Sequence, residues 1–437
     1  MTANKLSHYL PKLRFPEFRE DPIWSAPLLA ELYDFKRTNN LPRDELNYIA
    51  GTIKNIHYGD VHTKFKPLFR VENEHVPYIN PGTRPNEFSD DAFCEEGDIV
   101  LADASEDLGD VGKAIEVVSL DGERVVAGTH TILATRRGSV PVVGFGGQVF
   151  QSAAVRAGIR NEAQGAKVYG ISANRISAVP VPVPPTEAEQ QKIADCLGAL
   201  DDLIAAEGRK LEVLRQYRQG LMQQLFPQPG EAAPRLRFPE FVNEAWDSTT
   251  LGTLVSETER PIVMDDETEY ALVTVKRRYG GVVARKVLKG KAISVKSQFL
   301  IEANDFLISK RQIVHNACGL VPAELAGSIV SNEYSVLTAN NGCDIEFFNY
   351  FTQQPCVSDS FLQSSVGIVI EKMLFKLDWW LKLAFPFPSF AEQQRIAACL
   401  SWLDSRLALQ AQKLEGLKRH KQGLLQQLFP SLEEEAR

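Results

Sequence analysis

Lysine and arginine side chains gather in a few stretches of this sequence, where their chemistry suits contact with phosphate. Residues 276–311 hold ten Lys or Arg against two acids. Such a cluster can neutralise phosphate charge, and an arginine within it can read a guanine edge. An ordinary solvated surface is the alternative. We predict a nucleic-acid contact here, carried by Lys276, Arg277, Arg278, Arg285, Lys286, Lys310 and Arg311.

A second basic cluster lies in the first half of the chain. Residues 124–175 carry seven Lys or Arg and a single acid, Glu162, whereas 72–123 carries 15 acids. Much of the net charge of −8 therefore sits in one block, and an acidic average does not exclude a basic face. Aromatic residues interleave with the basic ones at Tyr58, Phe65 and Tyr279. The nucleic-acid contacts predicted in this half are Arg136, Arg137, Arg156 and Arg160.

Motifs that would carry catalysis are absent from the sequence. It has no phosphate-binding Gly-x-x-x-x-Gly-Lys-Ser/Thr loop, no Gly-x-Ser-x-Gly elbow, no His-Glu-x-x-His and no methyltransferase Asn/Asp-Pro-Pro-aromatic motif. The six cysteines form no Cys-x-x-Cys pair. Residues 144–148 form a glycine-rich stretch without an acidic ribose partner, which we interpret as a turn. We expect no catalytic residue, metal or cofactor in this chain; an enzyme in its own right is a less favoured alternative.

The elements that must position these residues form an internal repeat. Leu-Arg-Phe-Pro-Glu-Phe occurs at 13–18 and again, unchanged, at 236–241. Residues 188–227 align on 391–430 without a gap and share 23 of 40 positions. The segments between the shared motifs differ in length and show little similarity. This pattern indicates a common scaffold with two separate recognition segments.

Each shared segment predicts one long helix. Thr186 with Glu189, and Ser389 with Glu392, have the spacing of a capping box. Leucine and isoleucine then follow alternating spacings of four and three, which is typical of a coiled coil, interrupted at Glu207/Gln410 and Arg218/Lys421. We expect the two helices to pair along this seam, with packing on another protein as the alternative. The seam residues are Ile193, Leu197, Leu200, Ile204, Leu211, Leu214, Leu221, Leu225, Ile396, Leu400, Leu403, Leu407, Leu414, Leu417, Leu424 and Leu428.

The variable segments predict mixed α and β structure. Strand-like runs lie at 98–101, 114–118, 271–275 and 328–330. An acidic turn precedes a buried strand at 96–102 and again at 302–309, which suggests that the two folds are alike. The predicted class is α+β, with two β-rich domains separated by two long helices that form an antiparallel coiled coil, in a pseudo-twofold repeat. The chain has no run of 18 apolar residues and no apolar N-terminal signal, so we expect a cytoplasmic protein.

The ordered double set of motifs resembles the specificity subunit of type I restriction–modification enzymes. The resemblance rests on the Leu-Arg-Phe-Pro-Glu-Phe segments, the Glu-Gln-Gln-Lys/Arg-Ile-Ala helix starts and the Gln-Gly-Leu-x-Gln-Gln-Leu-Phe-Pro helix ends. Residues 167–172 also look like that family, and the similarity covers about the whole chain. It implies target recognition domains at 1–184 and 242–387, conserved coiled-coil helices at 185–227 and 388–430, a linker at 228–241 and a tail at 431–437.

The resemblance also implies the function. Each domain would read one half of a bipartite double-stranded DNA site, and the helices would set the gap between the halves. The subunit would have no catalytic centre and would dock two methyltransferase subunits, joined by restriction subunits that translocate and cut DNA. Adenine methylation would use S-adenosylmethionine, and cleavage would use ATP and magnesium, all held by the partner subunits. Exposed Gln190, Gln191, Gln223 and Gln224 are plausible methyltransferase contacts. A coiled-coil scaffold that binds only protein is the alternative.

Overall fold

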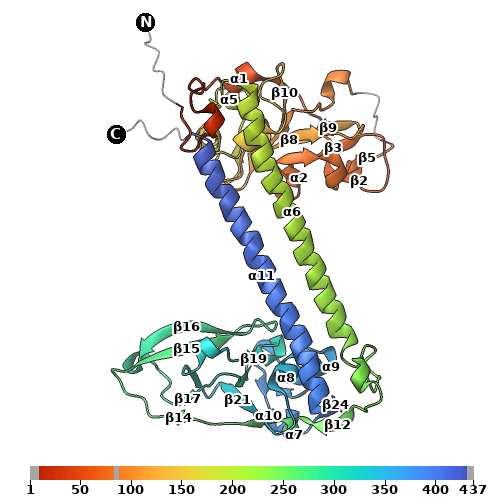
Figure 1. Cartoon of the computed structure of the whole chain (residues 1–437), viewed down its shortest axis with the longest axis vertical. Helices are drawn as coiled ribbons and strands as arrows, with labels where there is room; N and C mark the ends of the chain where they lie inside the picture. The colour runs from red at the N-terminus through yellow and green to blue at the C-terminus, as the bar shows by residue number, and fades with distance from the viewer. Residues whose placement is uncertain (1–8, 83–87, 431–437) are drawn as a thin grey trace. The chain divides into compact units, whose positions relative to one another are not determined.

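The computed structural model describes residues 9–82 and 88–430, and its contacts divide the chain into two compact units. Unit 1 comprises Met1–Gly208 with Gln412–Arg437, and unit 2 comprises Arg209–Ala411. The two long helices, α6 (Glu187–Gln224) and α11 (Phe390–Leu428), each contribute residues to both units (Figure 1). The domain boundaries predicted from the sequence follow the chain and stay a prediction; the tail at 431–437 lies outside the described residues.

Unit 1 is built on a five-stranded sheet. The strand order is β1 (Tyr33–Lys36), β10 (Thr131–Arg136), β6 (Ile99–Ala102), β8 (Ala114–Ser119) and β4 (Leu68–Arg70), with only β4 and β8 parallel. A second sheet has the order β2 (Leu46–Asn47), β5 (Tyr78–Ile79), β3 (Lys54–Ile56) and β9 (Val125–Ala127). β7 (Ala104–Ser105) pairs with β11 (Tyr169–Gly170). The helices are α1 (Leu29–Leu32), α2 (Tyr58–Thr63), α3 (Phe145–Val149), α4 (Ala153–Glu162) and α5 (Ala173–Ile176).

Unit 2 repeats this plan. One sheet has the order β13 (Val255–Glu257), β21 (Tyr334–Ala339), β18 (Phe306–Ser309) and β19 (Cys318–Leu320). The other has the order β14 (Pro261–Ile262), β17 (Gln298–Leu300), β20 (Ile329–Ser331), β15 (Glu269–Val275) and β16 (Val282–Lys289), the last two forming a long hairpin (Figure 1). Two small pairs are β12 (Asp247–Thr250) with β24 (Ala384–Phe387) and β22 (Ser365–Val366) with β23 (Leu374–Phe375). The helices are α7 (Leu251–Leu254), α8 (Ile345–Phe351), α9 (Pro355–Gln363) and α10 (Leu377–Trp380).

The likeness of the two recognition folds is confirmed. The order β1-β10-β6-β8 in unit 1 corresponds to β13-β21-β18-β19 in unit 2. In both units a buried aspartate closes the acidic turn before the central strand. Asp98 accepts the backbone N–H of Glu95 at 2.9 Å, and Asp305 accepts that of Glu302 at 2.7 Å. The predicted strands correspond to β6, β8, β15 and β20.

The central strands are apolar without alternation because both of their faces are buried. Along β6, Ile99 and Leu101 pack into the core beneath α3 and α4, whereas Val100 and Ala102 pack into the core shared with α2. On β18, Phe306 and Ile308 likewise face one core and Leu307 another. Burial on both faces favours a continuous apolar run over an alternating one.

The repeated hexapeptide joins the end of one long helix to the start of the other. In unit 1 the N–H of Leu13 donates to the Gln427 carbonyl of α11 at 2.9 Å, and in unit 2 the N–H of Leu236 donates to the Gln224 carbonyl of α6 at 3.0 Å. The next residue, an arginine, pairs with the glutamate at the other helix's start. Arg14 lies 2.7 Å from Glu189, and Arg237 lies 2.6 Å from Glu392. The indole N–H groups of Trp24 and Trp246 also donate to these two carboxylates, at 3.1 and 3.0 Å.

These contacts correct the predicted capping boxes. Thr186 does accept the Glu189 N–H at 3.3 Å, but the glutamate's carboxylate is bound by arginine and tryptophan rather than by the cap backbone. At the second helix the Glu392 carboxylate is likewise bound by Arg237 and Trp246, and the hydroxyl of Ser389 donates to Glu244 at 2.7 Å. Sequence spacing alone did not reveal that a distant arginine competes for each carboxylate.

Polar pairs within each unit show that the two long helices run antiparallel. In unit 1, Lys421 of α11 lies 2.7 Å from Asp201 of α6; in unit 2, Arg218 of α6 pairs with Asp404 of α11. The two pairs occupy matching repeat positions, so the predicted seam interruptions are interhelical polar contacts. Glu207 likewise pairs with Lys413. Partly buried polar pairs of this kind favour one register of the paired helices.

The predicted seam residues are all buried or half-buried. Their surroundings differ along the helices. Ile193, Leu197 and Leu428 belong to the core of unit 1, whereas Leu225, Ile396 and Leu400 belong to that of unit 2. The ends of the apolar stripe therefore anchor recognition domains. Pairing between the helices accounts for only part of the stripe.

The glycine-rich stretch predicted as a turn forms the start of α3. Gly144 adopts a φ of 93° and precedes the helix. A Cβ at Gly147 would lie 2.8 Å from both Leu68 and the Pro67 carbonyl, so glycine lets α3 approach the sheet closely. The first N–H groups then meet a buried carboxylate: Glu116 accepts from Gly144 at 2.8 Å and from Gly147 at 2.6 Å.

Glu116 makes the stability of unit 1 depend on pH. Burial raises its pKa to about 7, against 4.5 ordinarily, despite the two N–H donors. The folded chain therefore holds a proton that the unfolded chain releases, so this contribution is complete below pH 4.5 and is lost as the pH rises through about 7. We expect a slope of up to about 1.4 kcal/mol per pH unit in that window. In Glu116→Gln the slope in urea unfolding midpoints should become clearly shallower up to about pH 7, and the part that remains below about pH 6 belongs to Asp98, whose pKa burial raises to about 6. An unchanged slope would contradict the assignment.

Candidate nucleic-acid interface

Three segments of unit 2 converge on one surface. They are the basic turn (residues 276–280), the loop 310–316 and the finger (residues 365–375). The N–H groups of Arg278 and Tyr279 donate to the carbonyls of His315 and Asn316 at 2.8 and 2.9 Å. The N–H of Phe375 donates to the carbonyl of Lys310 at 3.0 Å. β-strand register thus brings together basic residues that lie far apart in the sequence.

The basic turn has a fixed backbone, and two of its cationic side chains lack partners among the described residues. Arg278 and Tyr279 have φ values of 57° and 54°, and the hydroxyl of Tyr279 donates to the Thr352 carbonyl at 2.9 Å. The Tyr279 ring is half-buried against the core of unit 2, where burial raises the pKa of its hydroxyl, so this side chain anchors the turn. The exposed side chains of Lys276 and Arg278 have no hydrogen-bond or ion-pair partner within residues 9–82 and 88–430.

The other predicted residues of this surface already hold acidic partners. Arg277 donates to Gln312 at 2.8 Å and lies 3.2 Å from Glu371, which is also 3.3 Å from His315. Arg311 pairs with Glu333 at 2.6 Å, and Lys310 lies 3.9 Å from Glu257. These pairs are largely exposed and hence weak, so phosphate can compete for the cations.

Arg285 and Lys286 lie further along the hairpin, on the edge strand β16. Both are exposed and line a hollow of about 230 Å³ on the sheet, together with Gln298 and Tyr334. The structure therefore gathers five of the seven residues predicted in this half around the basic turn. It places the other two five and six residues beyond the end of that turn, on a regular strand.

The counterpart surface of unit 1 has a different character. The segment 163–172 pairs with the strand after β6, Tyr169 opposite Ser105, as the finger does in unit 2. Beside it, Tyr58 is surrounded by three imidazoles, with ring centroids 4.8, 6.1 and 5.3 Å away for His57, His62 and His130. The adjoining loop 103–110 is acidic. This domain therefore offers aromatic and imidazole groups where unit 2 offers lysine and arginine.

The four arginines predicted in unit 1 do not form one surface. The guanidinium of Arg156 is half-buried and donates to the carbonyls of Gly112, Gly109 and Val111 at 2.6–2.8 Å. Arg136 donates to Ser139 and Pro141 carbonyls, both at 3.1 Å, and Arg137 pairs with Asp34 at 2.6 Å. Arg160 is exposed on α4. Arg136 and Arg156 thus hold loops. The carbonyls that Arg156 binds lie 44–47 residues away in the sequence, which gave no signal of the contact. DNA contact by these residues stays a prediction.

The comparisons with known proteins place this geometry in a family. The family model of the type I restriction modification DNA specificity domain matches residues 149–216 and 258–419, more than half of the chain. The chain belongs to this family. Its role is therefore DNA sequence specificity in a type I restriction–modification system. No curated protein matches.

A solved structure of a specificity subunit shares the fold, and two further solved structures of type I systems are similar at lower scores. The type I restriction–modification S subunit from M. genitalium is 15% identical, with 97% of this chain and 99% of that chain covered, at a TM-score of 0.59. A solved structure that concerns complex assembly and conformational transition of the type I R-M system is 15% identical. The match covers 92% of this chain and 96% of that chain, at a TM-score of 0.49. The HsdS subunit from Thermoanaerobacter tengcongensis is 15% identical, with 93% of this chain and 96% of that chain covered, at a TM-score of 0.42. At this identity, the first match shows the fold alone.

The glutamines considered as docking contacts of this specificity chain separate into two groups. Gln191, Gln223 and Gln224 are exposed. Gln190 is buried, which corrects the expectation that it is exposed: its amide donates to the Pro184 carbonyl at 3.2 Å and accepts the Val142 N–H at 3.1 Å. Gln393, its repeat partner, bonds Pro388 and Asp344 in the same way at 3.0 and 2.7 Å. Both glutamines tie a helix start to its own recognition domain.

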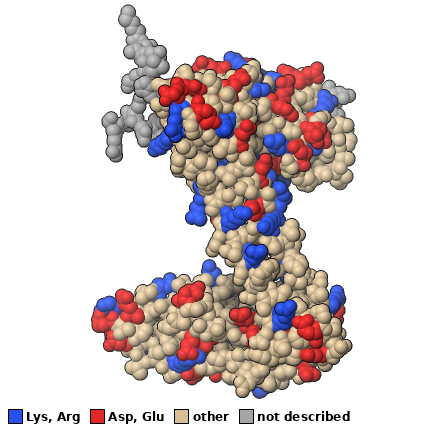
Figure 2. All heavy atoms as spheres, viewed as in Figure 1, with Lys and Arg blue, Asp and Glu red and all other residues tan. Residues whose placement is uncertain are grey.

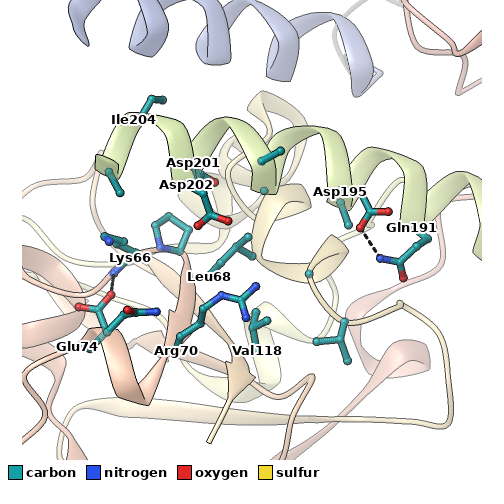
Figure 3. Close-up of a pocket in the computed structure, with 18 residues that line it drawn as sticks. Lys66, Leu68, Arg70, Glu74, Val118, Gln191, Asp195, Asp201, Asp202 and Ile204 are labelled. Carbon is teal, nitrogen blue, oxygen red and sulfur yellow. Dashed lines mark hydrogen bonds between the residues drawn. The ribbon is translucent and has the colours of Figure 1, made fainter. Parts of the chain in front are cut away.

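A larger groove in unit 1 runs along α6 and has a volume of about 590 Å³ (Figure 3). Asp195, Asp201 and Asp202 line it from the helix, and Lys66 and Arg70 line it from the sheet. Its charges are mixed. Figure 2 likewise shows basic and acidic side chains intermingled on the visible face of both units.

Within residues 9–82 and 88–430, no group of three His, Cys, Asp or Glu could hold a metal ion. In the same part of the chain, no helix is long and apolar enough to cross a membrane.

Proposed function

We propose that this specificity chain reads a bipartite duplex site, one half with each recognition domain, and directs adenine methylation and ATP-dependent cleavage by partner subunits. The observation that supports this is the repeat itself. The same strand order, the same Arg–Glu–Trp anchor and the same interhelical pair occur once in each unit, around recognition surfaces of different chemistry. Two readers of different half-sites on one scaffold account for this combination.

The partners of this complex follow from the same proposal. Two methyltransferase subunits would hold S-adenosylmethionine, and restriction subunits would hold ATP and magnesium, while this chain supplies sequence recognition and no catalytic group. Adenine must leave the stack to be methylated, so a reader that holds the duplex in register suits that chemistry. The cytoplasmic location expected from the sequence stays a prediction.

Methylome mapping tests the proposal. The chain would be expressed with the methyltransferase encoded beside it in a methylation-free host, and methyladenine would be mapped by long-read sequencing. We expect a two-part motif with a fixed gap that vanishes when this chain is omitted. Unmodified DNA despite a soluble complex would favour the scaffold alternative.

Lys276 and Arg278 of the basic turn should contribute measurably to the affinity for DNA. In Lys276→Ala/Arg278→Ala, we expect the affinity of the complex for its motif to fall about tenfold or more. The slope of log K against log salt should shrink by roughly two, because each phosphate contact releases about one counterion. Fluorescence anisotropy across a salt series would measure both quantities.

A matched variant controls for net charge. Lys289→Ala/Lys291→Ala removes two cations from the far end of the same hairpin, where both pair with Glu267 at 2.9 and 2.7 Å. We expect a smaller change in slope. Equal losses in the two variants would show that the basic turn has no special place in binding.

A further inference from the structure

The finger of unit 2 exposes aliphatic side chains to water. Ile368 is fully exposed, and Val366, Val369 and Ile370 are about half exposed. Four branched aliphatic residues within five positions leave an apolar tip on an otherwise polar surface. Contiguous apolar exposure of this kind marks a surface that another molecule covers.

The base of the finger is rigid, so it presents this tip in a defined place. Ser365 pairs with Phe375 and Val366 with Leu374 across β22 and β23. Gly367 has a φ of 152°, and a Cβ there would lie 2.9 Å from the Cα of Met373, so only glycine closes the loop. Beneath it, the Phe375 ring packs on Phe361 and Trp380 with centroids 6.0 and 5.8 Å away. Branched side chains are themselves stiff about χ1.

The charges around the tip favour DNA as the molecule that covers it. Glu371 of the finger holds Arg277 at 3.2 Å and His315 at 3.3 Å, which places the tip beside the basic turn with its free Lys276 and Arg278. Lys372 is exposed on the finger itself. An apolar tip flanked by cations complements a base stack flanked by phosphates.

The segment 163–172 of unit 1 has an arrangement similar to that of the finger, although its sequence differs. It turns at Gly165, where φ is 125° and a Cβ would lie 1.9 Å from the Val168 carbonyl. Val168 at the tip is 56% exposed, beside exposed Lys167. The two segments occupy equivalent places, each paired with the chain that follows the central strand. An exposed aliphatic residue next to lysine therefore occurs at this place twice.

We propose that the finger tip of unit 2, led by Ile368, inserts at a base step of the bound duplex and partly unstacks it. Apolar wedges of this kind kink DNA and let a protein read its deformability in addition to its base edges. The inference rests on the proposed DNA-reading function and adds a second mode of recognition to it.

The test uses the complex of full-length chain and methyltransferase with duplexes that carry the mapped motif. 2-Aminopurine is placed in turn at each position of the half-site read by unit 2, apart from the methylated adenine. We expect enhanced fluorescence at one step with the unsubstituted chain. In Ile368→Ser the enhancement should fall severalfold and the affinity about tenfold, since a buried aliphatic side chain is lost from the contact. Ile368→Leu should restore both.

Val263→Ser provides the matched control. Val263 is also fully exposed in unit 2, but it lies beside the acidic residues Asp265 and Asp266, and we expect no change in fluorescence or affinity. Motif binding by the unsubstituted complex without any enhanced step would overturn the wedge and leave the DNA-reading function standing. The wedge would also be overturned if the Ile368→Ser chain bound DNA normally but lost the methyltransferase during gel filtration, because the tip would then contact protein and not DNA. Absence of motif binding by the unsubstituted complex would overturn both proposals.

Discussion

Arg237→Ala is expected to lower the free energy of unfolding of the chain by about 3–5 kcal/mol. The guanidinium and the Glu392 carboxylate are 7% and 1% exposed, and the substitution leaves that carboxylate buried with only the Trp246 N–H as a side-chain donor. A buried charge without its counter-ion is far more costly than the intact pair is stabilising. Urea unfolding followed by tryptophan fluorescence would measure the loss, since Trp246 lies within the cluster.

Arg235→Ala provides the control two residues away. Arg235 is exposed and pairs with Glu231 at 2.8 Å, an i,i+4 contact worth less than about 1 kcal/mol. Arg14→Ala should reproduce the large loss in unit 1, because Arg14 and Glu189 are 8% and 1% exposed. A small loss at Arg237, similar to that at Arg235, would show that the Arg–Glu–Trp cluster does not anchor the helix start.

Exchange of residues 251–383 for those of a specificity chain with another target is expected to change one half of the methylated motif completely. The other half and the gap should stay as they are. The exchanged part lies between β12 and β24, which pair with Asp247 opposite Phe387 and Thr250 opposite Ala384. Both long helices, Arg237 and Trp246 remain in place. Methylome mapping would read all three features of the motif at once.

A wider exchange tests whether the cut points matter. Exchange of residues 242–387, the boundaries suggested by the sequence, also replaces Trp246, whose ring packs against Phe226 of the helix end at a centroid distance of 6.4 Å and whose indole N–H donates to Glu392 at 3.0 Å. We expect less soluble protein from that chimera. A changed gap in the narrower chimera would contradict the view that the helices alone set the spacing.

The sequence predicted the parts of this fold that depend on local spacing. Helix periodicity relates residues three and four apart, so the apolar stripe from Ile193 to Leu225 and its copy were visible without any structure. Duplication of the hexapeptide and helices indicated two related units, and the acidic turns at Asp98 and Asp305 indicated that their sheets are alike. The basic turn was also found, because its three cations are consecutive.

What the sequence did not determine depends on contacts between distant residues. Strand register brings the basic turn to loop 310–316 and the finger, although up to about 100 residues separate them. It also supplies the carbonyls that Arg156 binds and the arginine that takes the carboxylate of each predicted capping box.

By itself, then, the sequence determined that this specificity chain is two copies of one scaffold with long helices at matching places. Only the tertiary structure decided which of its charges are free for DNA and which hold the fold together. Charge clustering along a chain does not distinguish a solvated cation from one already paired, because the pairing partner is set by how distant elements pack together and not by position in the sequence. Within the part of the chain that the structure describes, Lys276 and Arg278 have no hydrogen-bond or ion-pair partner, whereas Arg156 and Arg237 are bound within the fold.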